Sequence, residues 1–415
     1  MTETIAGLAT KQKTGAIPQA SGSDERASPK RLVILGATGS IGRSCEQVLA
    51  GAPGRFDVVA LAGGRDGAAL ARSAVTLKAR FAAIADPAGY GELKDGVAGH
   101  AIEIAAGPEA VVEAALREAE LVVAAIAGTA GLAPTYAAIA AGRMVALANK
   151  ETLVCAGHAV MEAARRSGAC ILPLDSEHNA IFQAMSGCDP KQIVKMTLTA
   201  SGGPFREWSV ERIGAATVSE ALAHPNWAMG PKVTIDSASL MNKGLELIEA
   251  HHLFGMPVDR LDVLVHPQSV VHGLIAFADG SVSAGMAAPD MKTPIAHCLA
   301  YPERMDSGVK PLDLAAVGQL TFERPDLARF PALRLAIDAL TAGGGAPTAL
   351  NAANEIVVEA FLEARIGFSD MARVVETVLE QSGRAGELTA ASAATVAQAL
   401  AVHHIARDRA LSLLA

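Results

Sequence analysis

Residues 31–42 read RLVILGATGSIG, and this stretch decides how the first part of the chain folds. The apolar run that opens it is typical of a buried strand, and residues from about 43 to 50 favour a helix. The turn between them holds Gly36, Gly39 and Gly42. Glycines let the backbone approach a pyrophosphate, and a helix N-terminus attracts negative charge, so the stretch predicts a dinucleotide site. The alternative is a tight turn that binds no ligand.

A second predicted strand, Asp57–Leu61, ends in Gly63-Gly64-Arg65-Asp66. Folds of this kind bind the adenosine ribose at that point. Arg65 favours a ribose that carries a 2′-phosphate, whereas Asp66 favours a free ribose. Because the basic residue comes first after the glycines, we predict that the cofactor is NADPH.

Strand and helix patterns continue to alternate along the chain. Further strands are predicted at 81–85, 101–105, 121–127, 144–148 and 170–174. Such alternation predicts a parallel sheet covered on both faces, and we place this α/β domain of the Rossmann type at residues 31–174. Residues 121–142 carry no charge, but their glycines and proline divide them into strand, turn and helix, so we predict no membrane span.

The length, net charge and cysteine content of the chain limit the class of protein to which it can belong. A chain of 415 residues predicts two or three domains, and a net charge of −8 without a basic run disfavours nucleic-acid binding. Five dispersed cysteines without a C-x-x-C pair favour a reducing cytoplasm and disfavour a zinc ribbon. Residues 1–30 lack apolar periodicity and predict a disordered tail, with a transit peptide as the alternative.

Polar residues follow two of the predicted strands at their carboxyl ends, where open α/β sheets bind ligands. Lys150 would pair with a substrate phosphate or hydroxyl there, or lie in an ordinary loop. Asp175 and Glu177 form an oxygen-rich pair that suits Mg²⁺ or Mn²⁺. The alternative for Asp175 is a helix N-cap, and we expect the neighbouring His178 to pack or cap rather than bind the metal.

Residues 224–249 read HPNWAMGPKVTIDSASLMNKGLELIE and join a turn-prone loop to a polar helix. The loop contains Trp227 and is expected to be mobile, and a short strand is predicted at Lys232–Ile235.

In the helix that follows, Asn242, Lys243 and Glu246 share one face. A cation, an amide and a carboxylate beside a mobile loop suit a phosphorylated substrate and a metal. The alternative is a solvated helix with a routine ion pair. Glu249 stays an alternative to Glu246 as the metal ligand.

The remaining segments predict two further parts of the chain. Ser201-Gly202-Gly203 follows a strand at 194–200 and predicts a phosphate nest rather than a hydrolase nucleophile. We predict an α+β catalytic domain with a mixed sheet at 175–300, a linker at 301–330 and a C-terminal helical bundle at 331–415. The other strands of the mixed sheet are expected at 261–265, 273–277 and 282–286. The C-terminal helices are expected at 332–342, 349–364, 369–381 and 389–406.

Several strings, in this order, resemble the 1-deoxy-D-xylulose 5-phosphate reductoisomerase family. They include GATGSIG (36–42), ALANKET (146–152), LPLDSEHNAIFQ (172–183), TASGGPFRE (199–207), HPNWAMGPKVTIDSASLMNKGLELIEA (224–250), VHPQSVVHG (265–273), PDMKTPIAH (289–297) and LNAANEIVVEAFL (350–362). The resemblance runs from about residue 31 to the end. It implies a homodimeric, cytoplasmic enzyme of the non-mevalonate isoprenoid pathway, in which the domain at 175–300 also serves dimerisation.

Members of the family convert 1-deoxy-D-xylulose 5-phosphate to 2-C-methyl-D-erythritol 4-phosphate. The skeleton rearranges by retro-aldol and aldol steps, and the resulting aldehyde is then reduced by hydride transfer. The resemblance implies NADPH and one divalent metal, Mg²⁺ or Mn²⁺ with Co²⁺ as a further candidate. It also implies that Trp227 and Met229 lie on a flexible lid.

The resemblance carries the family's site residues onto this chain. The metal ligands fall on Asp175, Glu177 and Glu246. The catalytic residues fall on Lys150, Glu177, His224 and Lys243. The substrate contacts fall on Lys150, Ser176, Glu177, Ser201, His224, Ser237, Asn242, Lys243 and Glu246. The cofactor contacts fall on Thr38, Gly39, Ser40, Ile41, Gly64, Arg65, Asp66, Asn149, Glu151 and Gly230, although Asp66 stands where an uncharged Asn is familiar.

Two other functions compete with this one. A metal-free NADP-dependent dehydrogenase of the aldehyde or homoserine type would need a reactive thiol, and Cys188 and Cys298 lack the basic helix-start setting that activates one. A non-catalytic NADP-sensing protein would have lost a carboxylate or Lys243, and all of these residues are present.

Overall fold

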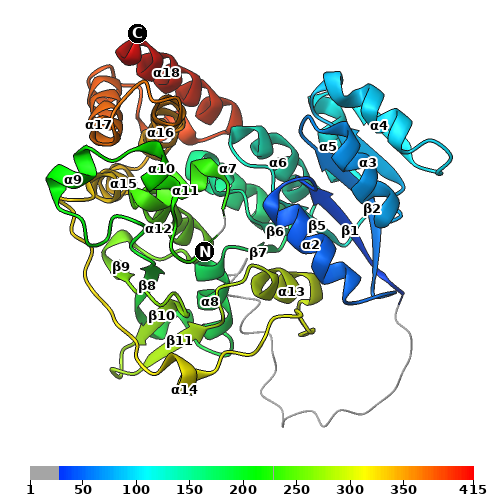
Figure 1. Ribbon diagram of the computed structural model, residues 1–415, viewed down its shortest axis with the longest axis horizontal. Helices are drawn as coiled ribbons and strands as arrows, with labels where there is room; N and C mark the ends of the chain where they lie inside the picture. Colours follow the sequence, from blue (N-terminus) through cyan, green and yellow to red (C-terminus); the bar gives the residue numbers. More distant parts are fainter. Residues whose placement is uncertain (1–27, 228) are drawn as a thin grey trace. The chain divides into compact units, whose positions relative to one another are not determined.

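The computed structural model describes residues 28–227 and 229–415, and the chain forms two compact units (Figure 1). The first unit comprises residues up to 149, 163–192 and 290–309, and the second comprises 150–162, 193–289 and 310–415. Each unit therefore combines segments that are distant in sequence, and the consecutive domain boundaries given above stay a prediction. Apart from positions 28–30, the predicted tail lies outside the described residues.

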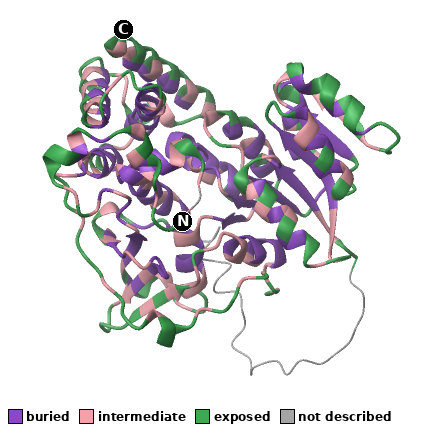
Figure 2. Cartoon of the chain, viewed as in Figure 1, coloured by how far each residue is buried: buried purple, intermediate pink, exposed green. Residues whose placement is uncertain are grey.

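The first unit is built on a seven-stranded sheet in the order β4-β3-β2-β1-β5-β6-β7, with every pair of neighbours parallel. The strands are β1 Lys30–Leu35, β2 Phe56–Gly63, β3 Phe81–Ile84, β4 Glu103–Ala106, β5 Leu121–Ala124, β6 Met144–Leu147 and β7 Ile171–Pro173. Consecutive residues of β1 are fully buried, and since alternate side chains point to opposite faces, both faces are covered (Figure 2). The predicted parallel sheet is confirmed.

Helices follow these strands as the alternating pattern predicted. They are α2 Ser40–Ala50, α3 Gly67–Thr76, α4 Tyr90–Gly96, α5 Pro108–Leu116, α6 Leu132–Ala140 and α8 Ser176–Ala184. Helix α13 Lys292–Ala300, from a later part of the chain, also belongs to the first unit. Short 3₁₀ helices lie at Pro87–Gly89, Thr129–Gly131, Pro190–Gln192, Val258–Arg260 and Ala390–Ala393. The uncharged segment at 121–142 forms β5, a 3₁₀ turn and α6, and none of the described helices is long and apolar enough to cross a membrane.

The strand order reverses at β1, so the carboxyl ends of β1 and β5 form the switch point of the sheet. Gly36 ends β1 there with a φ of +85°, and a Cβ on it would lie 2.4 Å from the carbonyl oxygen of Ala125. A Cβ on Gly42 would lie 2.3 Å from the carbonyl oxygen of Ala37. Only glycines permit this approach of the backbone segments, which shapes the turn before α2.

The second unit contains the predicted mixed sheet, and its four strands lie in the order β11-β10-β8-β9. The strands are β8 Ile193–Ala200, β9 Leu261–Val265, β10 Val271–Phe277 and β11 Val282–Met286. β8 runs parallel to β9 and antiparallel to β10, and β10 is antiparallel to β11.

Helices make up the rest of the second unit. They are α7 Lys150–Ser167, which continues into the first unit, α9 Val210–Gly214, α10 Val218–Leu222, α11 Pro231–Ala238, α12 Met241–Phe254, α14 Leu314–Val317, α15 Pro331–Ala342, α16 Ala346–Leu362, α17 Phe368–Arg384 and α18 Val396–Leu414. The last four form the predicted C-terminal helical region, in which the long buried helix α16 packs against α15, α17 and α18 (Figure 1).

One predicted element is wrong. Lys232–Ile235 is not a strand but part of α11, because Gly230 at the N-cap and Pro231 at the first position start a helix despite the β-branched residues that follow. Helix α7 is broken at Ala156, whose φ of −133° and ψ of 26° are not helical, so that a first segment begins at Lys150 and a second runs from Gly157 to Ser167. Gly157, directly after this break, admits a neighbouring side chain, since a Cβ there would lie 2.2 Å from the His252 ring.

Gly36→Ala tests whether the close backbone approach at the switch point holds the first unit together. We expect a loss of about 3 kcal/mol or more in the free energy of unfolding, measured by urea denaturation, because a clash adds to left-handed strain. Gly54→Ala is the matched control, because its φ is +78° but no described heavy atom lies within 4 Å of the added Cβ. It should lose only about 1–2 kcal/mol, the strain alone. Equal losses for the two variants would contradict the role of the contact.

Candidate active site

The turn between β1 and α2 presents an anion-binding helix N-terminus. Gly39 occupies the N-cap of α2 and, having no side chain, cannot cap the helix itself. Gly39 and Ser40 are exposed, whereas Thr38 and Ile41 are half-buried. The carbonyl oxygen of Thr38 accepts a hydrogen bond from Arg43 at 2.5 Å. The free N–H ends of a helix carry partial positive charge, so this turn suits a pyrophosphate.

Asn149 supports the other side of the switch point. Its side-chain amide donates to the carbonyl oxygens of Ile126 and Gly128, at 2.5 and 2.9 Å. The side chain is buried, and a Cβ on Gly131 would lie 3.0 Å from its nitrogen. Asn149, predicted as a cofactor contact, thus shapes the loop after β5 through its own hydrogen bonds.

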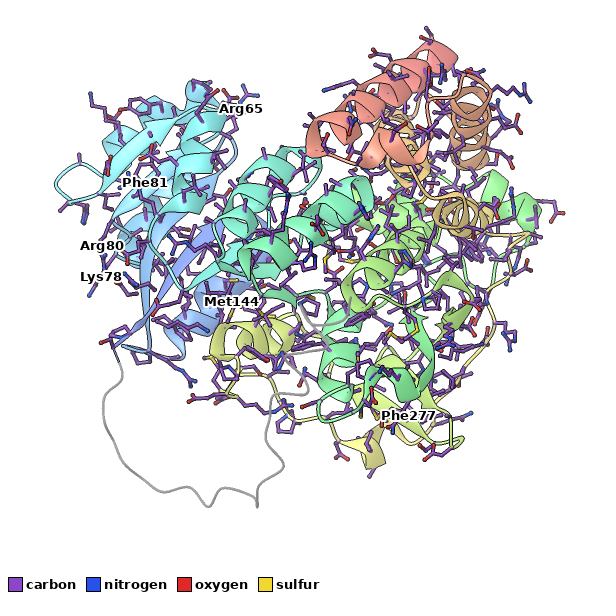
Figure 3. All side chains as sticks on the ribbon, turned by 180° about the vertical axis from the view of Figure 1, so that it is seen from behind. Arg65, Lys78, Arg80, Phe81, Met144 and Phe277 are labelled. Carbon is purple, nitrogen blue, oxygen red and sulfur yellow. The ribbon has the colours of Figure 1, made fainter. Side chains whose placement is uncertain are left out.

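The loop after β2 lies beside the glycine turn, since a Cβ on Gly63 would be 3.4 Å from the Thr38 methyl group. The Arg65 side chain, labelled in Figure 3, is 83% exposed. Its Nε lies 3.5 Å from the Asp86 carboxylate. Asp66 has a role that the sequence reasoning missed. It is the N-cap of α3 and accepts a hydrogen bond from the backbone N–H of Ala69 at 2.8 Å. A carboxylate used in this way fixes the loop beneath Arg65.

The predicted metal-binding carboxylates of the first unit stand at the start of α8, directly after β7. Among the described residues, Asp175 occupies the N-cap position without a capping hydrogen bond from its side chain, so the capping alternative is not supported. The Ser176 hydroxyl donates to the Glu177 carboxylate at 2.6 Å. His178 is buried, with its Nδ1 3.9 Å from Asp175.

A buried amide holds the loop that carries these carboxylates. Asn179 donates to the carbonyl oxygen of Pro173 at 2.9 Å and lies 3.0 Å from Nδ1 of His297 on α13. Gln183 donates to the Asn179 oxygen at 2.6 Å. Burial, assisted by the charge of Arg304, lowers the pKa of His297 to about 4, so the ring is neutral and can accept the amide proton. Sequence reasoning did not identify this support, although both residues lie in strings that it quoted.

In the second unit, α12 carries a buried ionic cluster. The Glu246 side chain is 2% exposed and that of Lys243 is 4% exposed, so the solvated-helix alternative is wrong. Lys243 lies 2.5 Å from one carboxylate oxygen of Glu246, and Asn242 donates to the other at 2.6 Å. The three residues therefore share one face, as their spacing predicted.

Lys150 joins this cluster from the first turn of α7. Its Nζ is 3.4 Å from Glu246 and 4.0 Å from Glu249, whose side chain is 3% exposed. The position of Lys150 in a helix, rather than in a strand-end loop, directs its amine at α12. The cluster thus holds two ammonium groups and two carboxylates away from water.

The predicted phosphate nest is a left-handed turn beside a histidine. Gly202 and Gly203 have φ values of +87° and +66°. The Ser201 hydroxyl accepts from the Gly203 N–H at 3.1 Å and lies 3.0 Å from Nε2 of His224. Successive N–H groups in such a turn form a concave anion site. Ser201 and His224 were both predicted as substrate contacts, and the fold brings them together.

Two backbone N–H groups orient the His224 ring. Its Nδ1 accepts from Asn226 and Trp227, at 3.1 and 3.0 Å, so the neutral ring carries its proton on Nε2 and donates it to Ser201. Burial lowers the pKa of His224, which favours this neutral form.

The segment after His224 is attached to the β9–β10 connection. The Asn226 amide donates to the Pro267 carbonyl oxygen and the Ser269 hydroxyl, at 2.8 and 2.9 Å. Trp227 packs edge-on against His272, with ring centroids 6.3 Å apart. Residue 228, in the predicted lid, lies outside the described residues, and the lid's mobility stays a prediction.

The remaining predicted contacts lie on α7 and α11 in the second unit. Gly230 is the exposed N-cap of α11, and Ser237 is half-buried near the end of the same helix. Glu151, in the first turn of α7, is buried and accepts from Lys232 at 3.2 Å.

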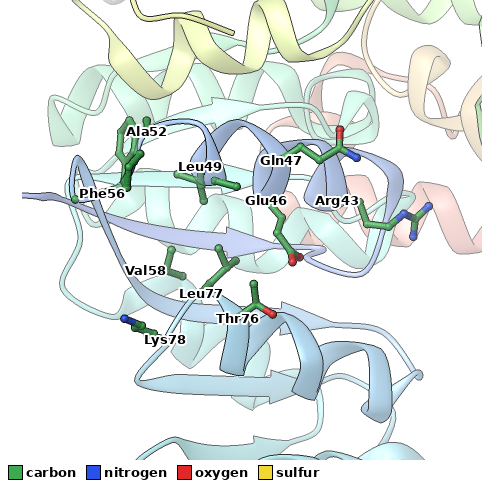
Figure 4. Close-up of a pocket in the computed structure, with 13 residues that line it drawn as sticks. Arg43, Glu46, Gln47, Leu49, Ala52, Phe56, Val58, Thr76, Leu77 and Lys78 are labelled. Atoms are coloured by element: carbon green, nitrogen blue, oxygen red, sulfur yellow. The ribbon is translucent and has the colours of Figure 1, made fainter. Parts of the chain in front are cut away.

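The first unit also has a groove of about 610 Å³ that contains none of the predicted site residues (Figure 4). Side chains of α2, including Glu46 and Gln47, line it together with Val58 of β2 and Leu77 after α3. It adds nothing to the chemistry of the glycine turn.

Comparison with known proteins agrees with this geometry. Residues 32–157 match the family model described as 1-deoxy-D-xylulose 5-phosphate reductoisomerase, 171–254 match its C-terminal domain model, and 286–409 match the DXP reductoisomerase C-terminal domain. The chain is 53% identical over 400 residues to the 1-deoxy-D-xylulose 5-phosphate reductoisomerase of Nitrobacter hamburgensis, covering 96% of this chain and 98% of that protein. The chain belongs to the 1-deoxy-D-xylulose 5-phosphate reductoisomerase family. The resemblance inferred from the sequence is thereby confirmed.

Solved structures of reductoisomerases share the fold. The enzyme from Zymomonas mobilis in complex with NADPH has a TM-score of 0.86 and 45% identity, covering 93% of this chain and 99% of that chain. A DOX-P reductoisomerase in complex with NADPH, fosmidomycin and magnesium has a TM-score of 0.89 and 44% identity, covering 93% of this chain and 98% of that chain.

The neutral His297 makes stability depend on pH. Its folded pKa of about 4 lies below the ordinary value of 6.5, so the unfolded chain binds the proton more readily. The contribution of the neutral ring to the free energy of unfolding is complete above pH 6.5 and is lost as the pH falls towards 4. The free energy of unfolding then declines by up to about 1.4 kcal/mol per pH unit.

His297→Gln keeps an acceptor for Asn179 but does not titrate, so we expect a flatter decline of the free energy of unfolding below pH 6.5, measured by urea denaturation at several pH values. His404→Gln changes an exposed histidine of α18 and should leave the slope as it is. An unchanged slope in His297→Gln would contradict the buried neutral ring.

Proposed function

We propose that this chain converts 1-deoxy-D-xylulose 5-phosphate to 2-C-methyl-D-erythritol 4-phosphate, with NADPH and one divalent metal, in the non-mevalonate isoprenoid pathway. Family membership supports the reaction. The observation that carries it to this chain is the water-excluded cluster of Glu246 with Lys243, Asn242 and Lys150. It supplies both a carboxylate for a cation and ammonium groups for an anionic substrate.

Asp175, Glu177 and Glu246 would hold Mg²⁺ or Mn²⁺, with Co²⁺ as a further candidate. The donor set fits, because hard divalent cations prefer carboxylate oxygens. The Asp175 carboxylate is not used to cap α8, and neighbouring donors orient Glu177 and Glu246. When bound, the cation supplies Lewis acidity to adjacent substrate oxygens, where charge develops during carbon–carbon cleavage.

The chain's own groups bind and orient the substrate in this proposal. The Ser201 nest, with His224 donating to the Ser201 hydroxyl, offers N–H and O–H groups to an oxyanion. Lys150 and Lys243 offer ammonium donors, and Asn242 an amide, to further oxygens. Ser176 and Ser237 complete the predicted contacts. The indole of Trp227 would exclude water from the hydride-transfer step.

NADPH would bind at the switch point of the first unit. The glycine cradle and the helix N-terminus at Thr38–Ile41 fit a pyrophosphate, because a Cβ on Gly36 would fill the space where the backbone segments meet. The exposed Arg65, beside Gly64, fits a 2′-phosphate, and Asp66 supports it through the cap on α3. Asn149, Glu151 and Gly230 are proposed as further contacts.

We further propose a homodimer in the cytoplasm. The family resemblance supports both, and all five cysteines, which lie within the described residues, are free thiols, as a reducing compartment favours. Light scattering of the purified chain tests the oligomeric state.

The metal-free dehydrogenase is disfavoured by thiol chemistry. Burial raises the pKa of Cys155 and of Cys298 well above the ordinary value, so neither is a ready nucleophile. Loss of NADPH absorbance on addition of 1-deoxy-D-xylulose 5-phosphate, with and without Mg²⁺ or Mn²⁺, tests the proposed function. Turnover only with metal is expected, and no turnover with metal present would refute it.

Glu246→Gln separates the metal site from the cofactor site. We expect turnover to fall by about 10³-fold or more, because the amide cannot replace a charged ligand, while NADPH binding measured by fluorescence is retained. Glu249→Gln is the matched control on the same buried helix face, and it should lose less than about tenfold. A larger loss in Glu249→Gln than in Glu246→Gln would make Glu249 the ligand.

A further inference from the structure

A short segment at residues 319–323 is fastened to the edge of the mixed sheet in the second unit, although it lies within the predicted linker. The backbone groups of Val265 and Glu323 exchange two hydrogen bonds, at 2.8 and 2.9 Å, and form an antiparallel bridge. Val265 is the last residue of β9, so the bridge lies where the chain leaves the sheet for β10. The segment is therefore in place to hold the β9–β10 turn, residues 266–269.

The β9–β10 turn binds three polar groups of Thr321. Nδ1 of the buried His266 lies 2.8 Å from the Thr321 carbonyl oxygen and carries the proton, because that oxygen can only accept. The Gln268 amide donates to the Thr321 hydroxyl at 3.1 Å, and its oxygen accepts from the Thr321 N–H at 3.2 Å. The His266 ring also stacks on Phe322, with ring centroids 4.7 Å apart. Both ends of the Gln268 amide are thus used to fix the turn to the segment.

The other side of the turn holds the loop that contains the predicted substrate contact His224. The Asn226 amide donates to the Pro267 carbonyl oxygen at 2.8 Å and to the Ser269 hydroxyl at 2.9 Å. These two acceptors flank Gln268 in the sequence. Ser269 has a φ of +53°, a left-handed conformation that is unfavourable for a residue with a side chain. Such a turn keeps its shape only if its surroundings hold it.

The turn also reaches the pair formed by Ser201 and His224. The backbone N–H of Asn226 donates to Nδ1 of His224 at 3.1 Å, and Nε2 of that ring lies 3.0 Å from the Ser201 hydroxyl. The backbone N–H of His266 donates to the carbonyl oxygen of Ala200, the residue before Ser201, at 2.7 Å. Both members of the pair are therefore held by the β9–β10 turn.

The segment at 319–323 has a second contact with the predicted phosphate nest, but this contact is weaker. Arg206 lies 3.0 Å from Glu323, and its side chain lies against Gly202, where a Cβ would come within 2.7 Å of it. The Glu323 side chain is 46% exposed, and exposed ion pairs contribute little. The pairing of Gln268 with Thr321 is therefore the contact that we expect to control the turn.

We propose that Gln268 is a positioning residue for the pair formed by Ser201 and His224. By pairing with Thr321 it keeps the β9–β10 turn in the strained conformation that anchors Asn226, and Asn226 in turn holds the His224 ring. Gln268 acts through these groups and not on the substrate. The kinetic consequence rests on the proposed function, but the anchoring of the loop can be measured without turnover.

Tryptophan fluorescence measures the anchoring directly. The chain has two tryptophans, so Trp208→Phe leaves Trp227 of the anchored loop as the only one. In this background, Gln268→Met should raise the acrylamide quenching constant of Trp227 about twofold or more, because methionine has a similar length but cannot pair with a threonine, and the loop opens locally. Gln398→Met is the matched control, because Gln398 also hydrogen-bonds a threonine, Thr395, but at the exposed start of α18. It should leave the quenching constant unchanged.

Steady-state kinetics test the consequence for the reaction. Gln268→Met should lower kcat/KM for the sugar phosphate by about tenfold or more, mainly through a higher KM, because misplaced binding groups lose much of their effect. Gln268→Glu should recover most of this loss, because a carboxylate can accept hydrogen bonds from both the N–H and the hydroxyl of Thr321. Gln398→Met should stay within about twofold of the parent.

A double-mutant cycle tests whether Gln268 acts through Thr321. Thr321→Val removes the hydroxyl at nearly constant shape, so it disrupts the same pairing as Gln268→Met. The double variant should therefore lose several-fold less kcat/KM than the product of the two single losses. Thermal unfolding of each variant shows whether it is folded at the assay temperature.

An unchanged Trp227 quenching constant in folded Gln268→Met overturns the proposal, whether or not the enzyme turns over. If Gln268→Met does not fold, Thr321→Val decides in the same way. In an active enzyme, a kcat/KM of Gln268→Met within about twofold of the parent, or strictly multiplicative losses in the cycle, would also overturn it. Absence of turnover in the parent protein would refute the proposed function, and the quenching result would still decide the role of Gln268.

Discussion

The second unit depends on one constraint, the burial of the Glu246 carboxylate. The Glu246 side chain is only 2% exposed. A charge buried in this way is tolerated only if hydrogen-bond and ion-pair partners replace the water that it has lost. Asn242 and Lys243 come from the preceding turn of α12, while Lys150 comes from the start of α7. The need to satisfy this carboxylate thus brings a distant helix to α12 and leaves ammonium groups beside the Glu246 oxygens.

The first unit depends on a different constraint, the absence of side chains. At the switch point of its sheet, Gly36 lets the backbone after β1 pass against Ala125 after β5. Asn149 then fixes the loop after β5 through two carbonyl oxygens. Close backbone packing leaves the N-terminus of α2 open to an anion. Glycine in the turn after β1 therefore serves both the packing of the sheet and the binding of a cofactor.

The sheet and most of the helices could be predicted because each rests on a local pattern. The spacing of Asn242, Lys243 and Glu246 likewise predicted a shared face, since it follows from helix geometry alone. Lys232–Ile235 was predicted as a strand because β-branched residues dominate it, whereas packing in the second unit and the start signal at Gly230-Pro231 favour a helix.

The partners of buried polar groups could not be predicted. Asp236 pairs with Asn354, which is 118 residues away, and Asn179 contacts His297 across an equal separation. No local pattern records such pairs, because they form only after the helices pack. The supporting residues around the candidate site, including the cap by Asp66, therefore emerged from the structure, whereas the residues proposed to carry the chemistry stood in recognisable strings.

The central claim is that Asp175, Glu177 and Glu246 hold one divalent cation next to the substrate. Anomalous diffraction from crystals grown with Mn²⁺ and NADPH tests it most directly, because the metal is located without reference to activity. The account predicts a single strong peak in contact with a carboxylate oxygen of each of these three residues. A peak bound by Glu249 in place of Glu246, or no peak near Asp175 and Glu177, would contradict it.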